Sequence, residues 1–235
     1  MFVSKLITFL CATASAGALS HTQMHKLAER AAANGTNGGP VSVTPHAQFS
    51  SSIGVLGCKI DVNRVAYWPM FPSCDDICVK VSANGRSVHL LRIDQSGGAN
   101  DISYDAWNYL STGKSARVAP IYGGGLAATW EPAPMSACAD LLIGTGGKLA
   151  LSAANSMNFI SSCAANATWV GMNYALYNIA DPQCRYGFDE LCFLPPPSQG
   201  NQAKCQGHQL GLNTPLTTAP VFNLDYGTGL QSLAL

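Results

Sequence analysis

The stretch Val79–Leu110, VKVSANGRSVHLLRIDQSGGANDISYDAWNYL, decides the fold of this 235-residue chain. Two β-rich runs, Val79–Ser82 and Ser87–Ile93, flank an Asn84-Gly85 pair. Asn-Gly between such runs is the strongest short signal for a β-hairpin, because both residues tolerate the positive φ that a tight hairpin turn requires. The stretch therefore predicts a hairpin of two antiparallel strands.

The second strand is followed by a corner and a short helix. It runs into Asp94, and the Gly-rich segment Gln95–Gly98 after it cannot continue a regular element. Asp101 or Ser103 is then placed to cap a helix over Tyr104–Leu110. The helical spacing puts three apolar residues on the inner side of this helix: Ala106, Trp107 and Leu110.

This order of strand, NG turn, strand ending in Asp, Gly-rich corner, Asp-aliphatic-Ser and helix resembles the centre of the double-psi β-barrel of expansins, barwin-like proteins, loosenins and rare-lipoprotein-A-type proteins. Gly123–Gly125 before Leu126–Pro134 adds to the likeness, because glycines precede the final strand of expansin-like barrels. The resemblance implies a mainly β fold, with a six-stranded double-psi barrel over residues 53–134.

The segments before the barrel are typical of export. Residues 1–16 carry Lys5, the apolar run Leu6–Ala12 and the site Ala14-Ser15-Ala16, which together predict a secretory signal peptide. The apolar run is too short to span a bilayer. Residues 17–52 contain few large apolar side chains and are predicted to be a flexible leader or pro-segment, with a short helix over Met24–Ala33.

The segments after the barrel depart from plant-type expansins, which append a β-sandwich. Residues 135–194 are predicted to form a Cys-rich, partly helical extension. Within it, Ser152–Cys163 has helical spacing, and Trp169–Ile179 is either helix or strand. Residues 195–235 are predicted to be a Pro-rich linker and an extended tail, with a strand at Val221–Leu224.

The cysteines indicate disulfide bonds. Removal of Cys11 with the signal peptide leaves an even number, which in an exported chain favours four disulfides of undetermined pairing. The alternative is a metal site at Cys74 and Cys78 with His89 or His208, but oxidising export favours bridges, so neither metal nor cofactor is expected. The cysteines concerned are Cys58, Cys74, Cys78, Cys138, Cys163, Cys184, Cys192 and Cys205.

The composition narrows the class of partner. The formal net charge is zero and 11% of residues are charged, with no basic stripe, so nucleic acid and anionic membranes are not expected as partners. A neutral polar surface suits neutral ligands such as glycans. Asn34-Gly35-Thr36 and Asn166-Ala167-Thr168 are acceptor sites for N-glycosylation in a eukaryotic source.

The resemblance also implies candidate catalytic residues. Asp101 falls at the position used as general acid in related small fungal endoglucanases. Their general base is the Asp of a motif like Thr-Arg-Tyr-Trp-Asp. The matching stretch here is Asn63–Pro69, which has Pro69 at the position of that Asp. Proline cannot accept a proton, and the relocated alternatives are Asp75 or Asp76. Loss of the base predicts binding without hydrolysis, so enzymatic activity is uncertain and the less favoured interpretation.

The predicted polysaccharide groove uses Tyr67, Trp68, Asp94 and Asp101, because aromatic faces stack on sugar rings and carboxylates accept hydroxyl hydrogen bonds. Core positions are the alternative for the two aromatic residues, and Trp107 suits a core better than a groove. Three functions follow from this pattern: a secreted, wall-polysaccharide-binding or loosening protein; a secreted effector or inhibitor that contacts a host or self protein; and a weak glycoside hydrolase.

Overall fold

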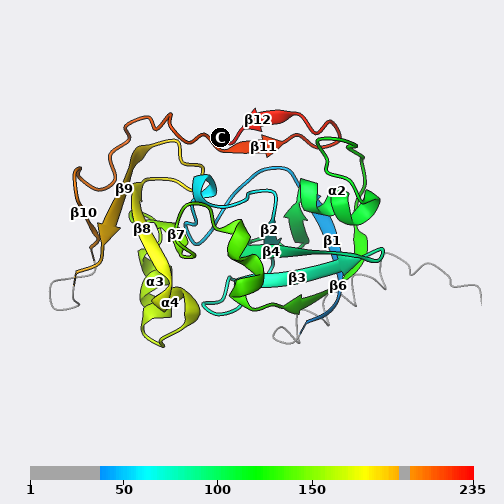
Figure 1. The fold of residues 1–235 in the computed structure, drawn as a ribbon, viewed down its shortest axis with the longest axis horizontal. Coiled ribbons are helices and arrows are strands. Elements are labelled where there is room, and N and C mark those ends of the chain that lie inside the picture. The colour runs from blue at the N-terminus through cyan, green and yellow to red at the C-terminus, as the bar shows by residue number, and fades with distance from the viewer. Residues whose placement is uncertain (1–37, 196–201) are drawn as a thin grey trace, which may run out of the picture.

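The computed structural model describes residues 38–195 and 202–235 of the chain. The fold is mainly β, with 16% helix, and Figure 1 shows a barrel beside a smaller second sheet. Within the described residues, no helix is long and apolar enough to cross a membrane. The predicted signal peptide, the predicted Met24–Ala33 helix and Asn34 lie outside the described residues.

Six strands close the barrel in the order β1-β5-β2-β4-β3-β6. The pairs β1–β5 and β2–β4 are parallel, and the other four pairs are antiparallel. The prediction of a mainly β fold with a six-stranded barrel is therefore confirmed. The strands are β1 (Gly39–His46), β2 (Val65–Trp68), β3 (Cys78–Ala83), β4 (Arg86–Gln95), β5 (Asn100–Ser103) and β6 (Leu126–Pro132).

The predicted hairpin is formed by β3 and β4, which pair antiparallel along the whole of β3 and over Arg86–Leu91 of β4. At the turn, Asn84 has φ 51° and Gly85 has φ 70°, the two positive values that the Asn-Gly signal implies. The predicted helix is α2 (Tyr104–Thr112), which ends at Gly113 in the left-handed conformation. Its three predicted inner residues are all buried in the barrel core.

The predicted side-chain cap of α2 is wrong. Ser103 occupies the N-cap position, but its side chain makes no capping bond. Its hydroxyl instead accepts from the Val65 amide and donates to the Val62 carbonyl, because Ser103 also belongs to β5, beside β2. Asp101 lies two residues earlier on β5 and bonds with Thr44. Neither of the two polar residues caps the helix.

The predicted start of the barrel at residue 53 needs correction, because β1 lies inside the segment assigned to a flexible leader. β1 pairs parallel with β5 and antiparallel with β6, and so closes the barrel. Val41 and Val43 are its two core residues. Two valines among small and polar residues give a weak local signal, and the strand is stabilised by the neighbouring strands that it pairs with.

The extension contains a four-stranded sheet of order β10-β9-β8-β7. Two short helices connect the parallel pair β7 and β8, so the run Trp169–Ile179 holds a helix and then a strand. Its elements are η2 (Met135–Leu141), β7 (Leu149–Ser152), α3 (Met157–Ala164), α4 (Trp169–Met172), β8 (Tyr174–Ile179), β9 (Gly187–Phe193) and β10 (Lys204–Cys205).

One apolar core runs through both halves of the molecule. Val55 and Leu56, just before the short helix η1 (Gly57–Lys59), pack in this core with Leu149 and Leu151 of β7. Four disulfides confirm the predicted number: Cys58–Cys184, Cys74–Cys163, Cys78–Cys138 and Cys192–Cys205. The first three join the barrel half to the extension, and the bridges leave no thiolate for the alternative metal site.

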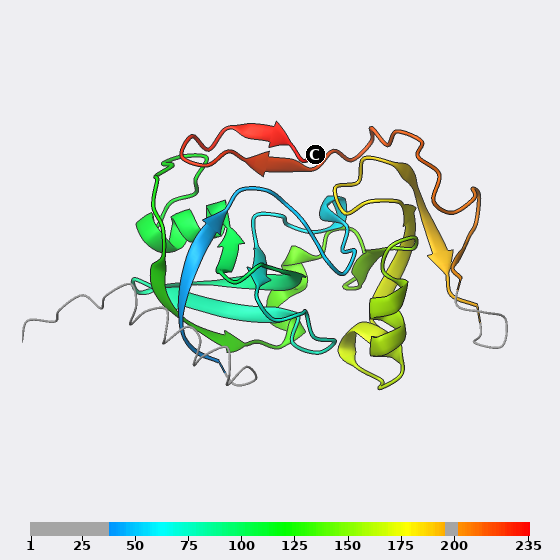
Figure 2. The ribbon, with the colours of Figure 1, turned by 180° about the vertical axis from the view of Figure 1, so that it is seen from behind.

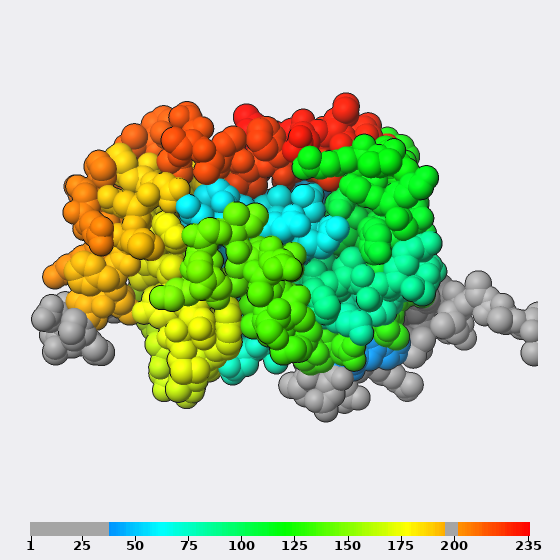
Figure 3. All heavy atoms as spheres, viewed as in Figure 1, coloured from blue at the N-terminus to red at the C-terminus, as the bar shows by residue number. Residues whose placement is uncertain are grey.

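The C-terminal segment passes from the extension back to the barrel. Figures 2 and 3 show it lying along one side of both halves. It ends in the hairpin of β11 (Phe222–Leu224) and β12 (Gln231–Leu233), and β11 confirms the strand predicted at Val221–Leu224. Asn223 and Leu224 are buried, so this hairpin is part of the packed structure.

Candidate functional site

Three of the four predicted groove residues lie in one row across the barrel strands. Tyr67 on β2 is in register with Asp101 on β5 and with Asp94 on β4. Asp101 is in turn in register with Thr44 on β1, whose hydroxyl donates to its carboxylate. Residues opposite one another on paired strands project from the same face of the sheet. This cross-strand row is therefore Thr44, Asp101, Tyr67 and Asp94.

Tyr67 is the buried centre of the row. Its side chain is 3% exposed, and its ring centroid lies 4.5 Å from that of His46. Burial raises the pKa of the phenol, and the negative charges of Asp94 and Asp101 raise it further, while hydrogen bonds with Ser103 and the Ser50 backbone lower it. The phenol therefore stays neutral, and its ring presents no open face to a sugar.

The two carboxylates of the row differ in exposure and in the number of hydrogen bonds that they accept within the protein. Asp94 is 8% exposed and accepts hydrogen bonds from Ser50 Oγ and from the amides of Ser52 and Gln95. It fastens the chain before β2 to the Gly-rich corner. Asp101 is partly exposed. It is thus the member of the row whose carboxylate is available to an incoming ligand.

The row is not arranged for hydrolysis. Asp94 and Asp101 are separated by two strand spacings, about 9–10 Å, which is close to the separation in inverting glycosidases. Tyr67 lies between them, however, where the sugar would have to be. Neither alternative base belongs to the row, because Asp75 accepts from the Trp169 amide (2.8 Å) and Asp76 accepts from Ser73 Oγ (3.4 Å).

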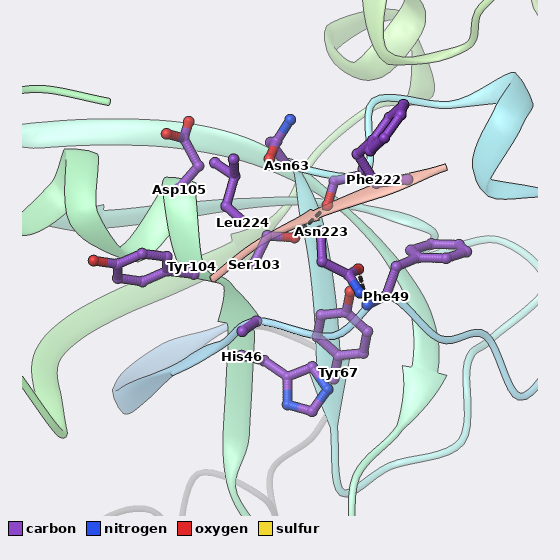
Figure 4. A pocket seen from close by; sticks show the side chains of 12 residues that line it. His46, Phe49, Asn63, Tyr67, Ser103, Tyr104, Asp105, Phe222, Asn223 and Leu224 are labelled. Atoms are coloured by element: carbon purple, nitrogen blue, oxygen red, sulfur yellow. Dashed lines mark hydrogen bonds between the residues drawn. The ribbon is translucent and has the colours of Figure 1, made fainter. Parts of the chain in front are cut away.

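The pocket beside the row is too small for a sugar. Figure 4 shows Tyr67 and His46 on one side of it and Asn223 of β11 near Phe49, whose amide donates to Asn223 Oδ1 (2.8 Å). Ser103 also lines it. Its volume of about 10 Å³ holds roughly one water molecule, whereas ligand pockets measure about 300–1,000 Å³. The β11 strand therefore closes this side of the row.

Trp68 does not join the row. It is 1% exposed and packs edge-on against Trp130 in the barrel core, with ring centroids 4.8 Å apart. Trp107 and Tyr104 are also buried. In this conformation none of these rings can stack on a polysaccharide, so the predicted aromatic groove is not formed and the core alternative holds for Trp68 and Trp107.

A different aromatic pair is exposed nearby. Tyr122, in the loop between α2 and β6, is 70% exposed, and Tyr226, in the turn of the C-terminal hairpin, is 37% exposed. Their ring centroids are 5.2 Å apart and the rings are nearly perpendicular, at 88°. Tyr226 also packs edge-on against Tyr104 and hydrogen-bonds to Gly123. The Tyr122–Tyr226 pair thus joins two segments about a hundred residues apart.

Helix α2 holds the loop that carries Tyr122. Four of its buried side chains bond to the backbone of residues 114–124. The Asn108 amide donates to the Lys114 and Ala119 carbonyls, and its oxygen accepts from the Ile121 amide. The other bonds run from Tyr104 Oη to the Ile121 carbonyl (2.9 Å), from Trp107 Nε1 to the Gly124 carbonyl (3.0 Å) and from the Ala116 amide to Asp105 Oδ1 (2.7 Å).

Asp105 is the charged member of this set. It accepts from Ser115 Oγ, from the Ala116 amide and from Arg64 Nη1 (2.8 Å). Burial raises the pKa of its carboxyl, but the hydrogen bonds from Ser115, Arg64 and Ala116 and the positive charge of Arg64 lower it more, so the net pKa lies below the ordinary value. Asp105 is therefore ionised at neutral pH and fastens the loop electrostatically.

Tyr122 and Tyr226 were not predicted as site residues, because the sequence around each of them carries no binding pattern. Tyr122 stands before three glycines, and Tyr226 lies in a predicted tail. An aromatic residue placed inside a Gly-rich loop was the available signal, since a loop has no core of its own to bury it.

The second glycosylation acceptor is accessible in part. Asn166 is exposed between α3 and α4, while the Thr168 hydroxyl donates to the Cys163 carbonyl and caps α4 through the Gly171 amide. Modification of Asn166 remains a prediction.

Comparison of the chain with family models, with curated proteins and with solved structures finds no match in any of the three.

Proposed function

We propose that the chain is a secreted, expansin-like protein that binds cell-wall polysaccharide without cleaving it, and that its barrel is of the double-psi type. The two parallel pairs β1–β5 and β2–β4, within an otherwise antiparallel closed barrel, support the barrel type. Four disulfides support export, because such bonds persist in oxidising compartments.

The exposed Tyr122–Tyr226 pair carries the binding proposal. Tyrosine rings offer apolar faces to the C–H faces of sugars and hydroxyls to their polar edges. The perpendicular rings form an angle, not a flat platform. Such an angle suits a single glycan chain better than the flat surface of a crystalline polymer.

Asp101 is a further candidate for polar contact with the glycan, on the cross-strand row and not on the tyrosine pair. Its partly exposed carboxylate is oriented by Thr44 and accepts hydrogen bonds from sugar hydroxyls. Because Tyr67 occupies the space between Asp101 and Asp94, the bound sugar stays outside the row and its glycosidic bonds are not broken.

Retention on insoluble and soluble wall glucans, xylans and chitin tests the proposal. Tyr122→Ala is expected to reduce retention by up to about tenfold, as loss of an aromatic contact of about 0.5–1.5 kcal/mol implies. Phe193→Ala is the matched control, because Phe193 on β9 is 55% exposed in the extension. Asp101→Asn is expected to weaken retention less, with Glu131→Gln on β6 as its control.

Two results would overturn the proposal. Equal loss of retention in Tyr122→Ala and Phe193→Ala would remove the tyrosine pair from binding. Release of reducing sugar that disappears in Asp101→Asn would establish hydrolysis in place of binding.

A protein partner is the second candidate function, and one observation favours it. Val118 and Leu230, each four residues from a member of the tyrosine pair, are 76% and 66% exposed. Exposed apolar and tyrosine side chains together are typical of protein interfaces. Absence of retention on every polymer would favour this function, and capture of a protein that is lost in Val118→Ser would support it.

A further inference from the structure

A buried cation lies at one end of the barrel. Arg92 is on β4, in register with Ala66 of β2, and its side chain is only 3% exposed. Ala66, Trp68 and Leu90 nearby belong to the barrel core. Removing a charge from water is unfavourable unless another group pairs with it. Arg92 therefore needs a partner.

The described part of the chain supplies no carboxylate within ion-pair distance; the contact that it does supply is the face of the Trp68 ring, over which the guanidinium lies. Among residues 38–195 and 202–235, Arg92 forms no ion pair, and its buried Nε has no hydrogen-bond acceptor. Asp76 acts from farther away, with its own carboxylate accepting from Ser73. Burial lowers the pKa of the guanidinium, and the negative charge of Asp76 offsets this in part.

A second unpaired donor lies beside the first. Trp68 Nε1 is buried without an acceptor, and the guanidinium carbon of Arg92 lies 5.9 Å from the centre of the Trp68 ring. Only three side chains of the described residues have a buried polar atom without a partner, and two of them are these neighbours. Native proteins rarely leave buried donors unpaired, and arginine and tryptophan side chains can only donate.

We propose that Trp68 and Arg92 form a binding site for a carboxylate anion at this end of the barrel. A carboxylate only accepts hydrogen bonds, its two oxygens match the planar guanidinium fork, and its charge neutralises the buried cation. The loop from Pro69 to Ile77 lies against this part of β4, since the Arg92 amide donates to the Ile77 carbonyl (2.7 Å) and Gln95 Nε2 donates to the Pro69 carbonyl (2.8 Å). Trp68 projects from the opposite face of β2 to Tyr67, so this site is separate from the proposed glycan site and does not depend on it.

Unfolding of the full, disulfide-bonded protein in sodium acetate tests the proposal. At constant pH 7 and constant ionic strength, acetate is expected to raise the unfolding midpoint in a saturable way, and chloride is not. Sodium galacturonate and galactose form the second comparison. A rise with galacturonate alone identifies a sugar acid as the ligand, a rise with both acids identifies a small carboxylate in general, and galactose is expected to have no effect.

Arg92→Met is the decisive variant, because methionine fills much of the same volume without charge. It is expected to fold and to lose the acetate-dependent rise. Lys80→Met is the matched control, since Lys80 is a partly exposed cation on β3 that pairs with Glu131. Lys80→Met is expected to keep the full rise.

Trp68→Phe keeps an aromatic ring, removes the indole donor and leaves a cavity in the core, so it is expected to lower stability and also to weaken acetate binding about tenfold. In the wild type, the Arg92 Nε resonance is expected to shift as acetate is added, which tests the site even where Arg92→Met does not fold. The proposal is overturned by a wild type that responds to neither acetate nor galacturonate more than to chloride, or by an undiminished carboxylate response in Arg92→Met.

Discussion

The barrel half and the extension each fasten a loop with one carboxylate, but they do so in different surroundings. In the barrel half, the Asp105 side chain is 8% exposed and holds Ser115 and Ala116. In the extension, Glu190 accepts from the amides of Gly207 and His208 near the surface, where 18% of its side chain is exposed. Hydrogen bonds to a carboxylate therefore fasten one loop in a nearly buried setting and the other loop in contact with water.

The difference shows how burial sets the cost of losing such a carboxylate. Asp105 is paired with Arg64, and removing its charge would leave a partly buried cation unpaired and weaken the hydrogen bonds from Ser115 and Ala116. The hydrogen bond from Asn178 is the largest cause that lowers the pKa of Glu190, followed by contacts with His208. Water can replace most of the Glu190 contacts. Loss of Glu190 is therefore expected to affect the loop that it fastens and to change the global stability little.

The disulfides give the largest expected contrast between the two halves. Cys58–Cys184 joins the halves across 126 residues, whereas Cys192–Cys205 closes a loop of 13 residues within the extension. Chain entropy predicts a loss of about 5 kcal/mol for the first bridge and about 3 kcal/mol for the second. Urea unfolding of the two double Cys→Ser variants measures this. Equal losses would contradict the contrast.

Asp105→Asn is expected to lower the free energy of unfolding by about 3 kcal/mol at pH 7, because it breaks the ion pair with Arg64 and removes the charge that strengthens the two loop-fastening hydrogen bonds to Oδ1. It is also expected to weaken polysaccharide retention by loosening the loop that carries Tyr122. Asp189→Asn is the control, since Asp189 pairs with Lys59 in a more exposed setting and is expected to cost less than about 1 kcal/mol. A similar loss in both variants would refute the role of burial.

Lowering the pH tests whether the charge of Asp105 is the source of its stabilising effect. The folded-state pKa of Asp105 lies below its unfolded value, so its stabilisation is fully present above about pH 4–5 and is lost as the pH falls through the folded-state pKa. The difference in unfolding free energy between wild type and Asp105→Asn is therefore expected to shrink between about pH 5 and pH 2. A difference that stays constant over this range would assign the loss to packing and not to charge.

Glu190→Gln is expected to have the smallest effect. The global unfolding midpoint should change little, while the amides of Gly207 and His208 exchange with solvent faster because they lose a charged acceptor. Hydrogen exchange of these two amides is the measurement, and the Ala116 amide in the barrel half is the internal reference. Unchanged exchange at Gly207 and His208 would show that Glu190 does not hold this loop.

Features that depend on a few neighbouring residues could be predicted from the sequence. The hairpin at Asn84-Gly85 follows from two residues that tolerate positive φ. The core side of α2 follows from helical spacing. The number of disulfides follows from the even set of cysteines that remains once the predicted signal peptide is set aside.

Elements that depend on distant partners were not predictable in the same way. β1 has only Val41 and Val43 as core residues, and it is stabilised by β5 and β6, which lie more than fifty residues away. The disulfide pairing likewise depends on how the extension packs on the barrel. A short sequence window contains neither partner, so only the assembled sheet and core determine these contacts.

The sequence by itself determined that the chain is mainly β, that it has a hairpin, a corner and a helix in its centre, and that its cysteines form four bridges. The tertiary structure alone decided which aromatic side chains reach solvent. Tyr67 and Trp68 lie on adjacent positions of one strand that is covered on both faces, so both are buried, while Tyr122 and Tyr226 meet where a loop and a hairpin turn lie over α2. The exposure of a side chain depends on which other segments pack around it, and the neighbouring residues in the sequence do not specify those segments.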